Sequence, residues 1–295
     1  MRRLLVFTLL AAASLLGADA DRDGLDDEME QALLLRFLPS FVISGGECDV
    51  APAEFMPGVR NPTVVARNGT IYGQVFPHDA ERVEVHYYHL CNRDCGPVSH
   101  SLDAEHVSAL VSVSNHEPKA EFWYAAAHED TLCDSGGAAS AKFLAAEQQG
   151  PPVWVSRAKH GSFLAAAVCR RGCGGDRCET VQTLKVHQII NIGEPGAPLN
   201  GAVWVNSGRW PLLAKMYSDF DAPLIARLQA SDGLVELRGV LMPAQVAIAG
   251  GGRAVTEVGG AEKRTEGAVS TAHGHVEKAL SGSKKSVKNW LRKRF

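Results

Sequence analysis

Short runs in which apolar and polar residues alternate occupy most of the chain from Asn61 to about Gly193. Successive side chains of a β-strand point to opposite faces, so this period of two predicts strands. The clearest run is residues 105–114, which separates an apolar face from a serine face: Val107, Ala109, Val111 and Val113 against Ser108, Ser112 and Ser114. Many such runs, broken by Gly, Pro and Asn, predict a mainly β protein, an antiparallel β-sandwich over residues 61–245.

Two local patterns add detail to this domain. The pair Asn68-Gly69 stands between two β-rich runs, which predicts the tight turn of a hairpin. Residues 209–229 instead place apolar residues at helical spacing on both sides of Pro223, and they predict a peripheral helical segment.

A twelve-residue stretch near the N-terminus, DADRDGLDDEME, has the pattern of an EF-hand calcium loop. Its ligand positions are Asp19, Asp21, Asp23, the carbonyl of Leu25, Asp27 and Glu30. Calcium is bound by oxygen atoms, and Gly24 stands where such a loop must turn sharply. Residues with helical spacing follow as far as Pro39, so residues 21–60 predict a calcium loop and a helix. The alternative is a solvated acidic turn.

Both ends of the chain lie outside the predicted sandwich. Residues 1–20 combine two Arg, an apolar run and small residues, as secretory signal peptides do, so we expect secretion or a place in the periplasm or cell envelope. Residues 246–274 have the composition of a flexible linker. Residues 275–295 form a basic amphipathic pattern that predicts peripheral contact with a membrane. The alternatives for this tail are a solvated segment or a helix packed on its own domain.

Composition narrows the class of protein. The net charge is −3 over 295 residues and the strongly basic segment is confined to the tail, which argues against nucleic acid as a partner. The seven cysteines favour disulfides in an oxidising compartment over zinc, because no C-x-x-C pair is repeated. Their spacing leaves the pairing open, although Cys91 and Cys95 are placed to clamp one loop. The odd number leaves one cysteine over.

Carboxylate and imidazole side chains gather around the stretch HSLDAEHV. Asp103 and Glu105 are two residues apart and share one face of a predicted strand. Asp94 ends the preceding strand, and His100 lies in the turn between the two. Crowded carboxylates repel unless a cation lies between them, so these four residues predict a divalent-cation site at the rim of the sandwich, for calcium, magnesium or manganese. The alternative is a polar loop with solvated charges.

The same stretch resembles the heptad G-H-R-H-D-W-E of the necrosis- and ethylene-inducing-like proteins, which are secreted cytolytic toxins with relatives among vacuolar-sorting-protein-like β-sandwiches. SHSLDAE stands in its place, with His100, Asp103 and Glu105 on the first His, the Asp and the Glu of the heptad. The resemblance implies that these three residues coordinate a divalent cation together with Asp94. The remaining positions of the heptad differ, being Ser99, Ser101, Leu102 and Ala104 here.

Other histidines divide into two groups. His128 in AAAHED and His160 in RAKHGSF resemble histidine-bearing stretches that follow the heptad in this family, which implies that they line the pocket. The alternative for both is a structural role. The histidines of the predicted strands are interpreted as structural, hydrogen-bonded groups: His86, His89 and His106.

Three functions agree with these patterns, and binding is favoured over catalysis. The first is an exported protein that recognises a sugar or a lipid headgroup through the rim cation. The second is a metal-assisted hydrolase with Glu105 or His128 as general base and Lys159 stabilising negative charge, although no Ser or Cys nucleophile beside a base stands out. The third is a structural component of the cell envelope.

Overall fold

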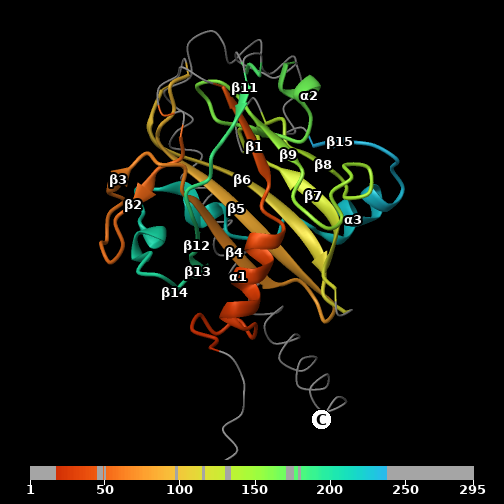
Figure 1. Cartoon of the computed structure of the whole chain (residues 1–295), viewed down its shortest axis with the longest axis horizontal. Coiled ribbons are helices and arrows are strands. Elements are labelled where there is room, and N and C mark those ends of the chain that lie inside the picture. The colour runs from red at the N-terminus through yellow and green to blue at the C-terminus, as the bar shows by residue number, and fades with distance from the viewer. Residues whose placement is uncertain are drawn as a thin grey trace, which may run out of the picture.

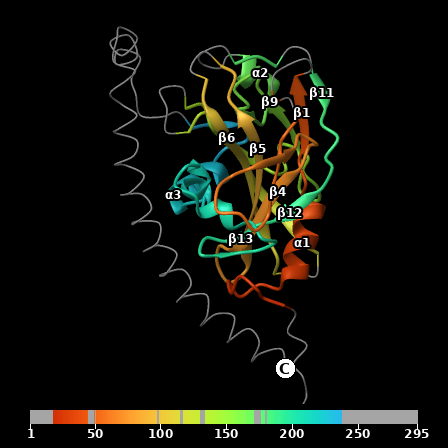
Figure 2. The ribbon, with the colours of Figure 1, turned by 90° about the vertical axis from the view of Figure 1, so that its left-hand side faces the viewer.

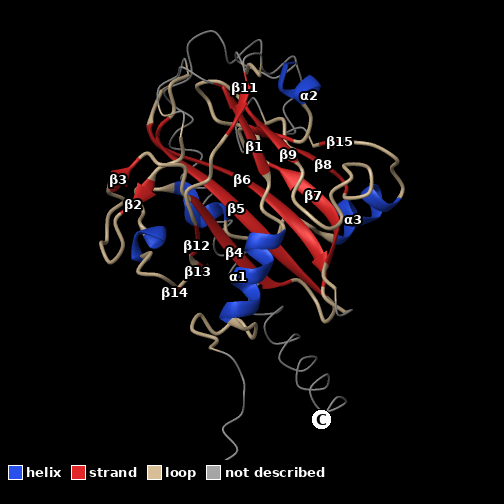
Figure 3. Ribbon diagram, in the orientation of Figure 1, coloured by secondary structure: helices blue, strands red, loops and turns tan. Residues whose placement is uncertain are grey.

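A computed structural model describes residues 18–44, 49, 51–96, 99–114, 117–129, 134–170, 176–178 and 181–237 of the chain. It is a mainly β structure in which two sheets pack face to face (Figures 1 and 3), which confirms the predicted β-sandwich with peripheral helices. The predicted signal peptide, apart from residues 18–20, lies outside the described residues. The predicted linker and basic tail lie outside them entirely.

The larger sheet has seven strands, and the smaller has four. In spatial order the larger sheet contains β12 (Ile189–Asn191), β4 (Ile71–Pro77), β5 (Arg82–Arg93), β6 (Ser101–Ser112), β7 (Lys119–Ala125), β8 (Gly137–Ser140) and β15 (Val235–Glu236). The smaller sheet contains β10 (Ser162–Phe163), β9 (Pro152–Val155), β1 (Ser40–Ser44) and β11 (Val181–Thr183). Two short pairs lie apart from these sheets, β2 (Glu54–Phe55) with β3 (Val64–Ala66) and β13 (Gly193–Glu194) with β14 (Ala197–Pro198).

The helices are short and peripheral. They are α1 (Asp27–Arg36), α2 (Ala166–Arg170) and α3 (Ala222–Gln229), with 3₁₀ turns η2 (Val203–Asn206) and η3 (Pro211–Lys215). Helix α1 begins where the Asp26 side chain accepts hydrogen bonds from two backbone N–H groups of the first turn. Within the described ranges, no helix has the length and hydrophobicity needed to cross a membrane.

The main core lies between the two sheets. On β6 the predicted apolar face supplies Val107, Ala109 and Val111, which are buried against Phe41 and Val153 of the smaller sheet. Helix α1 extends the same layer, because its residues Leu33, Leu34 and Phe37 join this core. The alternation read from the sequence therefore correctly identifies the inner face of the central strands.

The outer face of the large sheet is covered as well. Two further apolar clusters form there, one around Trp204 and Trp210 beside η2 and η3, the other around Phe220 and Leu228 beside α3. Figure 2 shows α3 on one side of the sheet and α1, β1 and β11 on the other. The middle of β5 and β6 is consequently buried on both faces, so polar side chains on either face need partners within the protein.

Two details of the strand pattern differ from expectation. The chain bends at Asn68, but the hairpin prediction is wrong: β3 pairs with β2, and β4 pairs with β5 and β12. The Asn68 side chain accepts hydrogen bonds from the backbone N–H and the hydroxyl of Thr70. This bend separates β3, which belongs to the short β2–β3 pair, from β4 of the large sheet. In addition, β1 contributes to the sandwich from before residue 61. The predicted helical segment of residues 209–229 is present as η3 and α3.

The cysteines also correct one expectation. Cys91 is buried and free, so it does not clamp a loop with Cys95, which is itself disulfide-bonded. Cys91 points into the inner layer of β5, where its sulfur lies 3.7 Å from the carbonyl of Asp49. Cys169 and Cys178 form a disulfide, which confirms the prediction that cysteines of this chain pair.

We predict that replacing Leu34, which is fully buried, destabilises the protein far more than replacing its neighbour Leu35, which is 60% exposed. Leu34→Ala leaves a cavity between α1 and the large sheet and should lower the free energy of unfolding by about 2–5 kcal/mol. Leu35→Ala should change it by less than about 0.5 kcal/mol. Urea unfolding of both variants checks this. Equal losses would show that α1 does not pack on the sheet as described.

Candidate functional site

The predicted rim carboxylates lie at the first half of β6 and face the smaller sheet. The register of β5 and β6 places Asp103 opposite Cys91 and Glu105 opposite His89. Residues directly opposite each other in an antiparallel pair share a face, so all four side chains continue the inner face of the sheet. Asp103 is 7% exposed and Glu105 is 4% exposed. The two carboxylates are therefore adjacent and nearly buried, as their spacing predicted.

Asp103 is held by His160, which comes from the turn between β9 and β10. The Asp103 Oδ2 and His160 Nδ1 atoms are 2.8 Å apart. Burial by itself would lower the pKa of His160, but Cys91 and the hydrogen-bonded Asp103 outweigh this effect and hold that pKa well above the usual value. Burial likewise opposes ionisation of Asp103, yet His160 keeps its pKa below the usual value. This pair is an imidazolium and a carboxylate.

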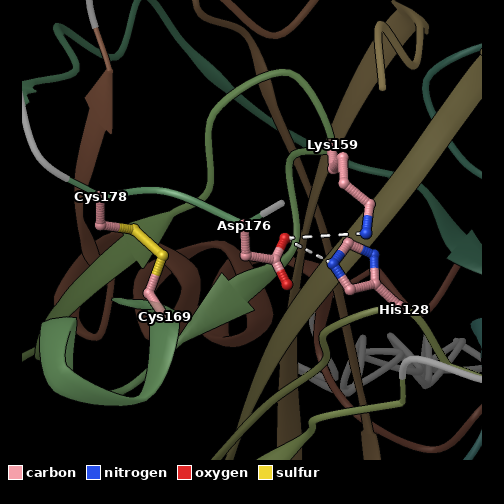
Figure 4. Close-up of a disulfide and its surroundings, with 5 residues drawn as sticks. All are labelled: His128, Lys159, Cys169, Asp176 and Cys178. Carbon is pink, nitrogen blue, oxygen red and sulfur yellow. Dashed lines mark hydrogen bonds and ion pairs between the residues drawn. A yellow bond between two sulfur atoms is a disulfide. The ribbon is translucent and has the colours of Figure 1, made fainter. Parts of the chain in front are cut away.

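Glu105 belongs to a second chain of contacts, through His128. The His128 Nδ1 atom is 4.0 Å from Glu105 Oε1, and its Nε2 atom is 2.7 Å from Asp176 Oδ1. Figure 4 shows His128 and Lys159 converging on Asp176, beside the Cys169–Cys178 disulfide. Asp176 lies two residues before Cys178, so the disulfide holds the backbone next to this carboxylate.

The carboxylate of Glu105 is incompletely satisfied. Its Oε2 atom is buried and has no hydrogen-bond partner among the described residues. Burial raises the pKa of Glu105 to about 7; Lys215 opposes this effect, and Asp103 adds to it. A buried carboxylate oxygen without a partner is unusual in proteins and indicates a missing proton, water or ion.

Asp94 and His100 lie at the turn between β5 and β6. Asp94 donates its backbone N–H to the carbonyl of His100, and the side chains approach to 3.6 Å between Asp94 Oδ2 and His100 Nε2. His100 keeps 54% of its side chain exposed, whereas Asp94 is nearly buried. Among the described residues, three ligand atoms within 4.8 Å of one another occur at two other places, and not among Asp94, His100, Asp103 and Glu105.

One of those places is a buried polar network on the opposite face of the same strands. His86 and His106 are fully buried there, and both face Asp219 from the segment between η3 and α3. The His106 Nε2 atom is 3.0 Å from Asp219 Oδ2, and the Ser108 hydroxyl donates to the same oxygen. The interpretation of these strand histidines as hydrogen-bonded groups agrees with this arrangement, as does His89, whose Nε2 is 2.9 Å from the carbonyl of His160.

The network continues to the rim through Glu129 and Lys215. Lys215 Nζ is 2.8 Å from Glu129 Oε2, and His106 Nδ1 lies 3.3 Å from the same oxygen. Burial would lower the pKa of His106, but Glu129 and Asp219 outweigh it and raise that pKa to about 10. Lys215 also acts on Glu105, so the two polar groups are electrostatically linked.

Sequence reasoning missed four members of this site: Asp176, Glu129, Lys215 and Asp219. Only Glu129 carries a local signal, because it directly follows His128. The other three come from segments far along the chain, and no spacing rule connects them to β5 and β6. The predicted calcium ligands form a separate cluster in the loop before α1 and in the first turn of α1, at the end of the molecule opposite α2 (Figure 1).

Comparison with known proteins yields distant likenesses. No family model matches the chain, and no curated protein matches it. Similar solved structures include NLPPya in complex with glucosamine (12% identity over 65% of this chain and 80% of that chain, TM-score 0.35). They also include Necrosis and Ethylene inducing Protein 2 from the causal agent of cocoa's Witches Broom disease (11% identity, 61% and 84% coverage, TM-score 0.37) and the non-toxic HaNLP3 protein (13% identity, 63% and 78%, TM-score 0.32).

Necrosis- and ethylene-inducing proteins are the family whose heptad the stretch SHSLDAE resembles. TM-scores of 0.32–0.37 leave the chemistry of the site to be argued from the residues of this chain.

The buried network generates a prediction about acid stability. Burial would raise the pKa of Glu84, but hydrogen bonds from His78, His86 and Ser218 outweigh it and lower that pKa to about 2. A carboxyl with a lowered pKa stabilises the fold above its unfolded pKa, near 4.5, and this contribution is lost as pH falls through about 2. Glu84→Gln should therefore lose on the order of 3 kcal/mol of stability at pH 7.

Chemical denaturation at pH 7, 5, 3 and 2 checks this, with Glu81→Gln as the control because Glu81 is exposed at the start of the same strand. The gap between Glu84→Gln and the wild type should close as the pH falls. A gap that stays constant from pH 7 to pH 2 would contradict the ionised state of Glu84.

Proposed function

We propose that this protein is an exported, cation-dependent binding protein that recognises a sugar or a lipid headgroup at the rim of its sandwich. Asp103 and Glu105 are the central ligands, with Asp94 and His100 at the adjoining turn. His128 and His160 border the site. The observation that carries the proposal is the buried Glu105 Oε2 atom, which lacks a partner beside a second buried carboxylate.

A divalent cation suits this arrangement better than a proton alone. Two carboxylates on one strand face repel each other, and Asp103 raises the pKa of Glu105. A cation between them would remove the repulsion and occupy the unpartnered oxygen. His160 and His128 already contact the carboxylates, so they would fix the orientation of the oxygens. The donors are chiefly oxygen atoms, which favours calcium, magnesium or manganese over zinc.

The ligand would bind through its own oxygen atoms, which would complete the coordination of this cation. Vicinal hydroxyls of a sugar and the phosphate oxygens of a lipid headgroup share that chemistry. His100, which is half-exposed beside Asp94, and Lys159, which contacts Asp176, place positive or neutral donors around the carboxylates. NLPPya structures hold glucosamine or mannosamine, and these aminosugars are suitable first probes alongside phosphate.

Export is the second part of the proposal. The segment of residues 1–20 has signal-peptide character, and the Cys169–Cys178 disulfide is of a kind that persists in oxidising compartments. Because this disulfide holds the loop that carries Asp176, an oxidising location also suits the geometry of the rim.

The double variant Asp103→Asn/Glu105→Gln tests the cation site. We expect wild-type protein to bind calcium, magnesium or manganese with one site more than the variant, as measured by isothermal titration calorimetry on metal-free protein. The control is Glu81→Gln/Asp232→Asn, which neutralises two exposed carboxylates elsewhere. Unchanged stoichiometry in the Asp103/Glu105 variant, with its circular dichroism spectrum intact, would refute the rim cation.

The contact between His128 and Asp176 favours a second candidate, a metal-assisted hydrolase. Asp176 and Glu105 outweigh the effect of burial and raise the pKa of His128 above its usual value. A base oriented in this way could activate a metal-bound water, with Lys159 near the developing negative charge. Asp176→Asn should then reduce hydrolysis by about 10–100-fold while cation stoichiometry stays unchanged.

Release of p-nitrophenol from glycoside, phosphate and acyl esters, with each of the three cations present, provides the measurement. If the wild-type protein releases none above the rate of the Asp176→Asn variant, the hydrolase candidate fails and binding remains.

A further inference from the structure

A second cluster of buried carboxylates, at the end of the molecule opposite the rim, has no role in the proposed function. It is formed by the loop of residues 19–30 and the first turn of α1. We infer that this loop is a calcium site that fastens α1 and the N-terminal segment to the edge of the large sheet. This inference does not depend on the rim site.

The backbone has the turns that the loop pattern requires. Gly24 adopts φ = +98°, a conformation that side-chain-bearing residues rarely adopt. The Asp23 side chain accepts the backbone N–H of Leu25 at 2.7 Å, which closes the turn around this glycine. The backbone N–H of Asp27 donates to the carbonyl of Ala18 at 2.7 Å, so the start of the loop is held against the start of α1.

The carboxylates converge, although they are spread over twelve residues. One ligand atom each from Asp19, Asp21 and Asp23 lies within 4.8 Å of the others, and the same is true of Asp21, Asp27 and Glu30. Asp21 belongs to both groups and joins them into one cluster of five carboxylates. The carbonyl of Leu25 is the further oxygen that the loop pattern supplies.

Independent of their convergence, several of these oxygens are buried without any partner. Asp21 is 4% exposed and Glu30 is fully buried. Both oxygens of Asp21, Oδ2 of Asp23 and Oε1 of Glu30 lack a hydrogen bond, and no ion pair reaches them among the described residues. Such unpaired, buried carboxylates are costly unless a cation is bound between them.

The cation would be coupled to the fold through Glu30. Asn191 at the end of β12 donates its side-chain amide to Glu30 Oε2 at 2.7 Å, which leaves the other oxygen, Oε1, toward the cluster. The Asn191 carbonyl in turn accepts the side-chain amide of Asn200. One turn further along α1, Leu34 packs against Gly73 so closely that a Cβ at Gly73 would lie 2.4 Å from it. A bound cation would thus link the N-terminal loop, α1 and strands β12 and β4.

Calcium is the cation that this donor set fits. Calcium takes six to eight oxygens in flexible geometry and uses a bidentate glutamate at the twelfth position, whereas magnesium needs a compact octahedron and keeps its waters. Five carboxylates and one carbonyl supply at least six protein oxygens, which leaves no place for the waters that magnesium keeps.

The test compares two single variants of the full chain that remove one charge each, two residues apart. Glu30→Gln removes the closing ligand, and Glu28→Gln removes an exposed carboxylate at a position of the loop that is not a ligand. For the wild type and Glu28→Gln, saturating calcium should raise the melting temperature by about 10 °C over protein in a chelator. Glu30→Gln should lose most of that shift. Magnesium at the same concentration should give a much smaller shift.

A third variant, Asp103→Asn/Glu105→Gln, separates this site from the rim and should keep the full calcium shift. Neutralising Glu30 relieves repulsion, so Glu30→Gln in chelator should melt no lower than the wild type, which shows that it folds. The inference is overturned if wild-type protein shows no calcium shift, if Glu30→Gln keeps it, or if magnesium equals calcium.

Discussion

The burial of β5 and β6 on both faces is the constraint on which the rest of the structure depends. These two strands are paired over almost their full length at the centre of the large sheet, with the smaller sheet on one face and η3 and α3 on the other. Every charged or imidazole side chain in the buried middle of these strands therefore needs a partner inside the protein. The inner face meets this demand with Asp103–His160 and Glu105–His128. The outer face meets it with a network of histidines and carboxylates around Asp219.

The two faces differ in how completely the demand is met. On the outer face, the carboxylates of Asp219, Glu84 and Glu129 each receive hydrogen bonds or ion pairs, which fix the segment before α3 to the sheet. The unsatisfied atoms there are imidazole nitrogens, His86 Nδ1 and His106 Nδ1. On the inner face, Glu105 retains an unsatisfied oxygen close to the turn that carries Asp94 and His100. The same contrast separates the N-terminal loop from ordinary acidic turns, because Asp21 and Glu30 also keep unsatisfied oxygens. Buried carboxylate oxygens without a hydrogen-bond partner, and not the number of acidic residues, distinguish the two candidate cation sites from the stabilising network.

Local sequence patterns predicted much of the fold and part of the candidate site. Alternation identified the inner face of β6, helical spacing identified α1, and the spacing of Asp103 and Glu105 placed them together. Patterns failed where pairing depends on distant segments. Asn68-Gly69 has the local sequence of a hairpin turn, yet β4 pairs with β5. Residues of both strands are buried in the core between the sheets, which stabilises this pairing. Asp176 contacts His128 from 48 residues along the chain, and Asp219 contacts Ser108 from 111 residues along the chain. No local pattern could predict contacts across such separations.

The central claim, that the rim carboxylates hold a divalent cation, is tested most directly by crystallography. Crystals grown with calcium should give an anomalous difference peak about 2.3–2.6 Å from carboxylate oxygens of Asp103 and Glu105. The N-terminal loop provides a second position in the same map at which to judge whether calcium entered the crystal. A peak at the rim would support the account. A map with a clear peak at Asp21 and Glu30 and none beside Glu105 would contradict it.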